Sequence, residues 1–402
     1  MLSESGSSTS PVITLPARAA KLGRRGHPWF YRDDLEGIEL PENALVRVHA
    51  PGGRDLGLGI TSSSSKIALR LCGGWSDESV PDPETFFRAR LKDSVELRRS
   101  WIAPQSGVRL VHSESDQMPG LIVDRYADVL VIQSTASFVE TQLDTITAIL
   151  SEEFSPSMVL SRGDLPVRSR EGLPQEVRIL AGEKIEETEI DEGGVRHRIR
   201  PFDGHKTGFY LDQRPARARV NQLARGQRVL DLFSYQGAFS LAALAGGARE
   251  VIAVDQSTDA LERASHAAAD HGFSSFATIA GNAFDVVRDL RNDGERFDLI
   301  VLDPPPFCKS RRELEGGKRG YRDLNRIALR MLAPGGRLIT ASCSYHLRPE
   351  IFEDVLRQAS FDLPFRVFLE ERLGAGPDHP AWIRLPESEY LKVRVLRRID
   401  GD

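Results

Sequence analysis

The fold of this 402-residue chain is decided by DLFSYQGAF, residues 231–239, together with DPPPF, residues 303–307, and SCS, residues 342–344. Each string directly follows an apolar run of strand length. From about residue 201 onward such runs alternate with segments of helical periodicity. This alternation predicts a doubly wound α/β fold, with a mostly parallel sheet covered by helices on both faces. The last two strand-like runs have no evident helix between them, which predicts a closing antiparallel hairpin.

Composition excludes several classes of protein. No stretch offers the roughly 18 uninterrupted apolar residues of a membrane span. Residues 1–10 lack the basic patch and apolar core of a secretory signal, so we expect a disordered tail. Three cysteines are too few and too scattered for a disulfide framework or a zinc site, which favours a reducing cytoplasm and no metal. The net charge of −5 argues mildly against a protein that coats nucleic acid by charge alone.

Two domains are expected ahead of the α/β domain of residues 201–402. Residues 11–78 contain short β-type runs punctuated by turns, which predicts a small β-rich module. Residues 79–200 mix helical stretches with strands, which predicts a compact α+β domain with a scaffolding or substrate-positioning role.

A basic and aromatic cluster lies within the β-rich module, in KLGRRGHPWFY, residues 21–31. Small RNA-binding modules combine base stacking on aromatic rings with neutralisation of the backbone. The candidate RNA-binding residues are therefore Arg24, Arg25, His27 and Trp29. The alternative is an ordinary solvated turn with a core-facing aromatic cluster, and composition alone leaves it open.

Several polar residues follow the strands of the α/β domain, at the edge where such sheets bind ligands. Asp231 ends the first strand, and Gly237 would let the backbone approach a ligand closely. Asp255 ends the second strand, where a carboxylate can accept hydrogen bonds from both ribose hydroxyls. The GxGxxG fingerprint is absent, which disfavours a nicotinamide cofactor. Asn282, after the third strand, could bond an adenine amino group or cap a helix.

The next two strand ends carry the candidate chemistry. Asp303 is followed by Pro304 and Pro305, which fix a rigid turn and would hold the carboxylate against a flat substrate; a plain turn is the alternative. Cys343 follows the fifth strand. A lone cysteine is most often a small buried apolar residue, but at this edge nearby donors can lower its pKa. A thiolate that adds to C6 of cytosine makes C5 nucleophilic toward a methyl donor.

Six ordered motifs and several flanking runs together resemble a known family. The additional strings are HPWFY (27–31), ESDQMPGLIVDRY (114–126), HKTGFYLDQR (205–214), AVDQS (253–257), GYRDLN (320–325), ASCS (341–344) and DHPAWIRLPESEYLK (378–392). With the strings above they resemble the bacterial 23S ribosomal RNA 5-methylcytosine methyltransferases over most of the chain. The resemblance implies a PUA domain, a central α+β domain and a Rossmann-like methyltransferase domain. It also implies S-adenosylmethionine as cofactor and 23S ribosomal RNA as partner.

Carried onto this sequence, the resemblance implies Cys343 as the nucleophile that bonds C6 of the cytosine, with Asp303 also catalytic. It implies cofactor contacts from Lys206, Tyr210, Gln213, Asp231, Phe233, Ser234, Tyr235, Gly237, Asp255, Asn282 and Asp303. We expect substrate contacts from Pro304, Pro305 and Phe307. Two positions depart from the family: Pro306 stands where a lysine is common, and Asn282 replaces a usual aspartate.

A second cysteine assists product release in other RNA cytosine-5 methyltransferases. Cys308 lies five residues after Asp303, further along than in those enzymes, and we expect it to be a bystander. The flipped or unpaired base that ring methylation requires favours naked 23S RNA or an early assembly intermediate as substrate. A homodimer is left open.

Three rival functions remain at this point. Methylation of an exocyclic amine uses Asp-Pro-Pro followed by an aromatic residue, and Phe307 lies one residue late for that motif. A non-catalytic RNA-binding protein could retain a decayed methyltransferase fold. A small-molecule methyltransferase is disfavoured, because two accessory domains suit a large substrate better.

Overall fold

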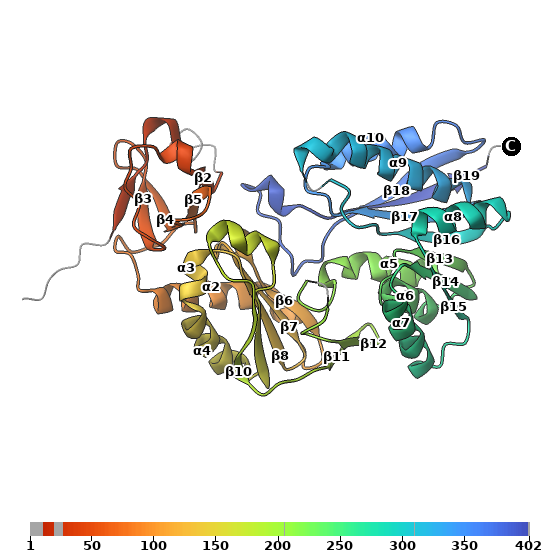
Figure 1. Cartoon of the computed structure of the whole chain (residues 1–402), viewed down its shortest axis with the longest axis horizontal. Coiled ribbons are helices and arrows are strands. Elements are labelled where there is room, and N and C mark those ends of the chain that lie inside the picture. The colour runs from red at the N-terminus through yellow and green to blue at the C-terminus, as the bar shows by residue number, and fades with distance from the viewer. Residues whose placement is uncertain (1–10, 20–26, 205, 309, 401–402) are drawn as a thin grey trace, which may run out of the picture. The chain divides into compact units, whose positions relative to one another are not determined.

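The computed structural model describes residues 11–19, 27–204, 206–308 and 310–400 (Figure 1). The chain forms two compact units. The first unit contains the chain up to Ile190, with Ile199–Phe209 and Pro377–Ser388. The second contains Asp191–Arg198, Tyr210–Gly376 and the residues from Glu389 onward. The polypeptide therefore passes between the units more than once.

The first unit begins with the small β-rich module that the turn-punctuated sequence predicts. Its sheet has the order β1-β3-β4-β5-β2, and only β1 and β3 pair in parallel. The strands are β1 (Val12–Thr14), β2 (Trp29–Tyr31), β3 (Leu45–His49), β4 (Asp55–Thr61) and β5 (Ile67–Leu71). Phe30, Val46 and Leu69 are fully buried in its apolar core.

A second five-stranded sheet, of order β10-β9-β8-β7-β6, completes the first unit. Its strands are β6 (Gly107–His112), β7 (Leu121–Tyr126), β8 (Val129–Ser134), β9 (Met158–Arg162) and β10 (Val177–Gly182). Its helices are α2 (Pro83–Arg98), α3 (Ser137–Thr141) and α4 (Leu143–Phe154). Asp82 caps α2 by accepting from the Thr85 amide at 2.9 Å, directly before a proline at the first helical position. The sheet and its helices share one core with Phe86, Phe87 and Ile132 fully buried.

The second unit is built on a seven-stranded sheet of order β15-β14-β13-β16-β17-β19-β18. The strands are β13 (Arg228–Leu232), β14 (Glu250–Asp255), β15 (Phe276–Ala280), β16 (Phe297–Leu302), β17 (Leu332–Ser342), β18 (Arg366–Leu373) and β19 (Lys392–Ile399). The first five are parallel, and β19 pairs antiparallel with both of its neighbours. A short two-stranded sheet pairs β11 (Thr188–Glu192) with β12 (Val195–Ile199).

Helices cover both faces of this sheet, which confirms the predicted doubly wound fold (Figure 1). They are α5 (Arg214–Leu223), α6 (Ala238–Ala245), α7 (Thr258–Asp270), α8 (Ala283–Asn292), α9 (Leu314–Arg330) and α10 (Pro349–Ala359). Neighbouring strand residues point to opposite faces: Val229 packs in the cluster of α5 and α6, and Leu230 in that of α8, α9 and α10. Burial on both faces explains the continuous apolar runs.

The closing strands pair antiparallel, from Arg366 opposite Ile399 to Leu373 opposite Val393. Their connection is longer than the predicted hairpin suggests, because Pro377–Ser388 packs within the first unit. Asp378 in this segment is fully buried and accepts a hydrogen bond from the Arg109 amide at 3.1 Å. Its carbonyl accepts from Nε of the buried Arg98 at 3.1 Å. Hydrogen bonds between buried residues therefore hold the segment Pro377–Ser388 in place.

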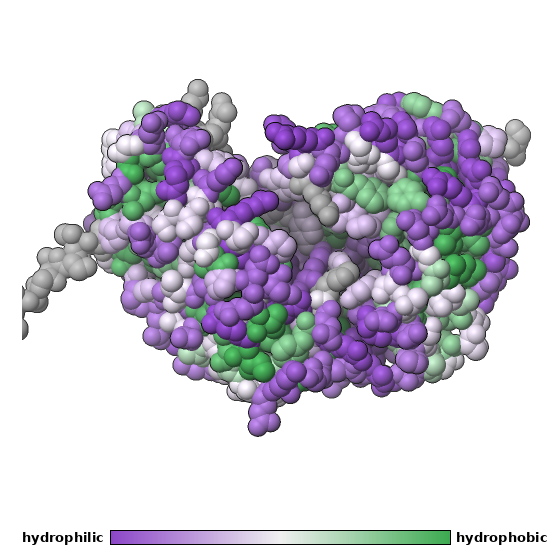
Figure 2. Space-filling model, in the orientation of Figure 1, coloured by the Kyte–Doolittle hydropathy of each residue, from purple (hydrophilic) through white to green (hydrophobic). Residues whose placement is uncertain are grey.

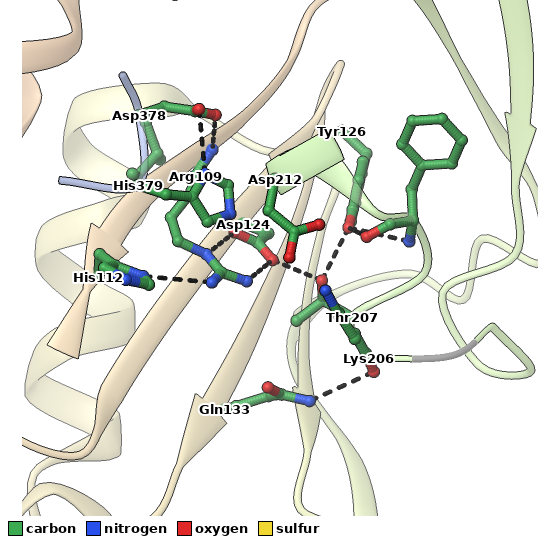
Figure 3. A network of polar contacts seen from close by, with 12 residues as sticks. Arg109, His112, Asp124, Tyr126, Gln133, Lys206, Thr207, Asp212, Asp378 and His379 are labelled. Atoms are coloured by element: carbon green, nitrogen blue, oxygen red, sulfur yellow. Dashed lines mark hydrogen bonds and ion pairs between the residues drawn. The ribbon is translucent and has the colours of Figure 1, made fainter. Parts of the chain in front are cut away.

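The same polar network holds Ile199–Phe209 (Figure 3). The Arg109 guanidinium donates to both carboxylate oxygens of Asp124 at 2.7 Å. The Thr207 hydroxyl also donates to Asp124, and its oxygen lies 2.7 Å from the Tyr126 hydroxyl. Strands β6 and β7 thus supply the partners for two segments that are distant in sequence.

Among the described residues, the large apolar side chains that reach the surface include Phe361, Phe368 and Ile383. The face drawn in Figure 2 is largely hydrophilic, with scattered apolar patches. Within the described ranges, no helix has both the length and the apolar character needed to cross a bilayer.

Candidate active site

The loop between β13 and α6 has an unusual backbone. Phe233, Tyr235 and Gly237 have φ values of +63°, +48° and +72°. Left-handed conformations are costly for side chains with a Cβ, and such strain clusters at functional sites. The loop is held by hydrogen bonds from the Ser234 amide to the Val254 carbonyl at 3.0 Å and from the Tyr235 amide to Asp255 at 2.8 Å.

Both its positive φ and the close packing around it require a glycine at position 237. A Cβ built on it would lie 2.8 Å from the Ala264 Cβ on α7. Close packing against a helix therefore accounts for this glycine, whereas the sequence argument invoked a ligand. Its contact with a ligand stays a prediction.

Asp231 is a buried carboxylate at the end of β13. It is 1% exposed, and Oδ2 accepts a hydrogen bond from the Ser240 hydroxyl at 2.7 Å. Burial raises the pKa of Asp231 to about 7, although the Ser240 bond opposes this shift. The position can hold a cation, whose charge would compensate for the burial.

Asp255 and Asn282 lie at the next two strand ends. Asp255 accepts from the amides of Tyr235 and Ser257, at 2.8 and 2.9 Å, which fixes its carboxylate at the end of β14. Asn282 caps α8 by accepting from the Phe284 amide at 2.9 Å. Of the two interpretations of Asn282, helix capping is the one with a contact in the structure.

Tyr210 and Gln213 precede α5. Burial raises the pKa of the Tyr210 hydroxyl, and the neighbouring Asp303, then Tyr235, add to the shift. The rings of Tyr210 and Tyr235 meet edge to face, with centroids 6.3 Å apart. Side chains from three separate segments therefore converge at the carboxyl edge of the sheet.

Three buried polar atoms at this edge have no hydrogen-bond partner among the described residues: Gln213 Oε1, Asp231 Oδ1 and Ser234 Oγ. Buried polar atoms are rarely left without partners in folded proteins. All three are acceptors, and the serine hydroxyl can also donate. The set fits a polar, partly cationic ligand such as the methyl donor that the sequence implies.

Cys343 is partly exposed just after β17, although both flanking serines are fully buried. The Ser344 hydroxyl accepts from the Cys308 amide at 3.3 Å and lies 3.0 Å from the Tyr321 hydroxyl. The Ser344 amide donates to Ser342 Oγ at 3.3 Å. These bonds fix the backbone on either side of the thiol, and Cys343 also acts electrostatically on Tyr210.

Cys308 lies deeper, with 1% of its surface exposed. A Cβ on Gly317 of α9 would come within 2.1 Å of its sulfur, so the thiol fills the space that the glycine leaves. Burial raises the pKa of this thiol. Both properties disfavour reaction at Cys308 and agree with the bystander prediction.

The Asp-Pro-Pro turn has Pro304 buried, whereas Pro305 and Pro306 are exposed. Phe307 packs between the rings of Phe284 and Tyr321, with centroids 5.9 and 4.7 Å away. This ring contributes to the core that α8 and α9 share, which leaves it less available for stacking on a base.

The predicted residues of the first unit have mixed surroundings. The Lys206 carbonyl accepts from Gln133 at 3.2 Å (Figure 3). The Trp29 indole donates to Glu114 at 3.0 Å, and His27 packs edge to face on Trp29. The core-facing interpretation of the aromatic cluster holds for the fully buried Phe30. Arg24 and Arg25, like His205, lie outside the described residues.

Lys392 was not predicted by sequence reasoning. It is the first residue of β19, 2% exposed, and pairs in register with Ser342, next to Cys343. The available signal was a lysine at the start of a strand with alternating apolar residues, in LKVRVL.

Comparison with known families gives two matches. Residues 115–386 match the S-adenosylmethionine-dependent methyltransferase family, and residues 13–72 match a PUA-like domain. The chain is 39% identical to ribosomal RNA large subunit methyltransferase I of Aeromonas salmonicida, over 96% of this chain and 98% of the relative. It is 37% identical to the protein of the same name from Vibrio cholerae, over 95% and 98%.

Solved structures agree at the level of the fold. A methyltransferase complexed with SAH superposes with a TM-score of 0.83 at 22% identity, over 96% of this chain and 100% of that one. A SAM-dependent methyltransferase from Streptococcus mutans gives a TM-score of 0.81, with the same identity and coverage.

Proposed function

The chain belongs to the family of S-adenosylmethionine-dependent large-subunit ribosomal RNA methyltransferases, and from this we propose that it methylates C5 of a cytosine in 23S ribosomal RNA. The proposed nucleophile is Cys343, through a covalent bond to C6. The observation that carries the proposal is the partly exposed Cys343 thiol, flanked by two buried serines at the edge where Tyr210 and Asp303 lie close together. We place the reaction in the cytoplasm.

The proposed roles follow from the chemistry of cytosine. The Cys343 thiolate adds to C6, and the electron pair of the C5–C6 double bond moves to C5. S-adenosylmethionine, when bound, would supply an electrophilic methyl group to C5 and leave as S-adenosylhomocysteine. Loss of the C5 proton to a base, for which water suffices, restores the double bond and releases the thiolate. Asp303 would accept hydrogen bonds from the base and hold it flat.

The proposed cofactor contacts use the acceptors described above. Asp231 and Gln213 would face the cationic end of the donor, and Asp255 would accept bonds from its ribose hydroxyls. The strained loop of Phe233, Ser234 and Tyr235 would contact the donor through its backbone. The proposed set is completed by Lys206, Tyr210, Gly237, Asn282 and Asp303.

Methylation of an exocyclic amine is the main alternative. It requires an aromatic residue free to stack on the base and needs no thiol. Phe307 packs between two other rings, which favours the cytosine-5 reaction.

The direct test is nucleoside mass spectrometry of 23S RNA, from cells lacking this gene, after incubation with the protein and S-adenosylmethionine. We expect 5-methylcytidine to form, with naked RNA a better substrate than finished subunits. Formation of N4-methylcytidine or a methylated purine would overturn the proposal. Comparison with wild-type RNA, already modified, provides the control.

A pH dependence of cofactor binding follows from Asp231. Because its pKa is about 7 in the free protein, only the fraction with an ionised carboxylate is ready to bind a cation. The affinity for S-adenosylhomocysteine should rise with pH, and at pH 6 the Kd should be about tenfold higher than at pH 8. Isothermal titration calorimetry between these pH values measures it. Asp231→Asn should bind weakly and lose this dependence, whereas a wild-type Kd that does not change with pH would contradict the assignment.

The raised pKa of Asp231 also makes the free energy of unfolding depend on pH. The folded state holds the Asp231 proton more tightly than the unfolded chain does. The stabilisation that this proton gives to the folded state is therefore fully present below the unfolded pKa of about 4, and it is lost as the pH rises through the folded pKa of about 7.

A further inference from the structure

The ammonium of Lys392 is a buried charge without a carboxylate partner. Its Nζ donates to two main-chain carbonyls, those of Ser344 at 2.8 Å and Tyr390 at 2.7 Å. No aspartate or glutamate among the described residues forms an ion pair with it. Two neutral carbonyls satisfy hydrogen bonds but do not balance a charge, and a buried cation without a counter-ion is costly.

The candidate for the missing anion is the thiolate of Cys343. Nζ donates to the carbonyl of Ser344, so the ammonium contacts the residue that directly follows Cys343. We propose that Lys392 is the counter-ion of the Cys343 thiolate, a positioning residue that keeps this thiol ionised at neutral pH. The inference rests on the proposed function, because it assigns a purpose to a thiolate at this position.

The electrostatics of Lys392 agree with this geometry. Burial lowers the pKa of Lys392 to about 8, and Cys343 is the largest influence in the opposite direction. The other groups that act on Lys392 are Arg394, Cys308 and Glu389, and those on which Cys343 also acts are Tyr210 and Tyr321. Cys308 is a weaker candidate for the anion, because it is buried and its own pKa is raised.

The pairing explains how a cysteine in this position can react. An unperturbed cysteine is mostly protonated at pH 7, and only the thiolate adds to C6. A positive charge within about 4–6 Å lowers the pKa of an acid by one unit or more. The hydrogen bonds from Lys392 to two main-chain carbonyls would keep that charge in place.

The test is the pH dependence of Cys343 alkylation by iodoacetamide in the full chain, followed by peptide mass spectrometry, which separates this thiol from Cys72 and Cys308. In Lys392→Met we expect the alkylation midpoint to rise by at least about one pH unit, with about a tenfold slower rate at pH 7. Lys392→Arg, which retains the charge, should restore the midpoint. Lys318→Met removes a half-buried lysine of α9 that pairs with Glu315, and it should leave the midpoint unchanged. Superimposable profiles for Lys392→Met and wild type would overturn the inference.

A reciprocal measurement covers the case in which Lys392→Met does not fold. Removal of the anion in Cys343→Ser should lower the titration midpoint of Lys392 by a similar amount, as measured by NMR of the side-chain nitrogen in ¹⁵N-lysine-labelled protein. An unchanged midpoint would contradict the pairing. Failure of the proposed function can be distinguished from failure of the pairing. A methyltransferase that works without Cys343 could still show the shifts in both titration midpoints. An inactive Cys343→Ala with unshifted Lys392 variants would disprove only the pairing.

Discussion

Replacement of Cys343 by alanine is expected to lower the rate of methyl transfer by at least about 10³-fold while cofactor binding stays intact. Cytosine C5 is a poor nucleophile until a thiolate has added to C6, so loss of the sulfur removes the step on which the rest depends. The rate is measured by transfer of a labelled methyl group to 23S RNA. Calorimetry with S-adenosylhomocysteine shows whether the binding pocket is preserved.

Cys308→Ala is the matched control, because that thiol is buried against Gly317 and has a raised pKa. It should remain active. RNA that carries 5-fluorocytosine should trap wild type and Cys308→Ala as a covalent adduct, because fluorine blocks the final proton loss. Full activity in Cys343→Ala, or an adduct formed without Cys343, would refute the covalent mechanism.

Replacement of Asp124 by alanine should destabilise the first unit by about 3–5 kcal/mol, as is typical when one partner of a buried ion pair is removed. Asp124 is fully buried and accepts two hydrogen bonds from Arg109 and one from Thr207. Without it, the Arg109 guanidinium stays buried without its counter-ion. Urea denaturation followed by tryptophan fluorescence measures the loss, since Trp29, Trp75 and Trp101 all lie in this unit.

Glu152→Ala provides the control for this prediction. It removes an ion pair with Arg88 on the surface, where solvent screens the charges, so the urea midpoint should hardly change. An equally small effect of Asp124→Ala would show that the network does not hold the two returning segments. Asp124→Asn keeps the shape of the side chain and separates loss of charge from loss of packing.

Much of the candidate site could be predicted because it follows strand ends. Asp231, Asp255 and Asp303 each close an apolar run, and in a parallel sheet such positions share one edge. The roles of these residues remain predictions, whereas the proximity of Asp303 to Tyr210 and of Asp255 to Asp231 is a property of the structure. The prediction for Gly237 was less complete, because sequence cannot show that α7 packs against it.

The sequence alone determined the fold class, because that depends on local periodicity, and it implied the cofactor through the family resemblance that the short strings at strand ends carry. Only the tertiary structure decided which buried charges meet. The pairing of Lys392 with Ser342 is set by sheet register, and the burial of Asp378 beside Arg109 joins residues 269 positions apart. The local sequence does not indicate such contacts, because a lysine or an aspartate is expected to be exposed unless the folded chain buries it.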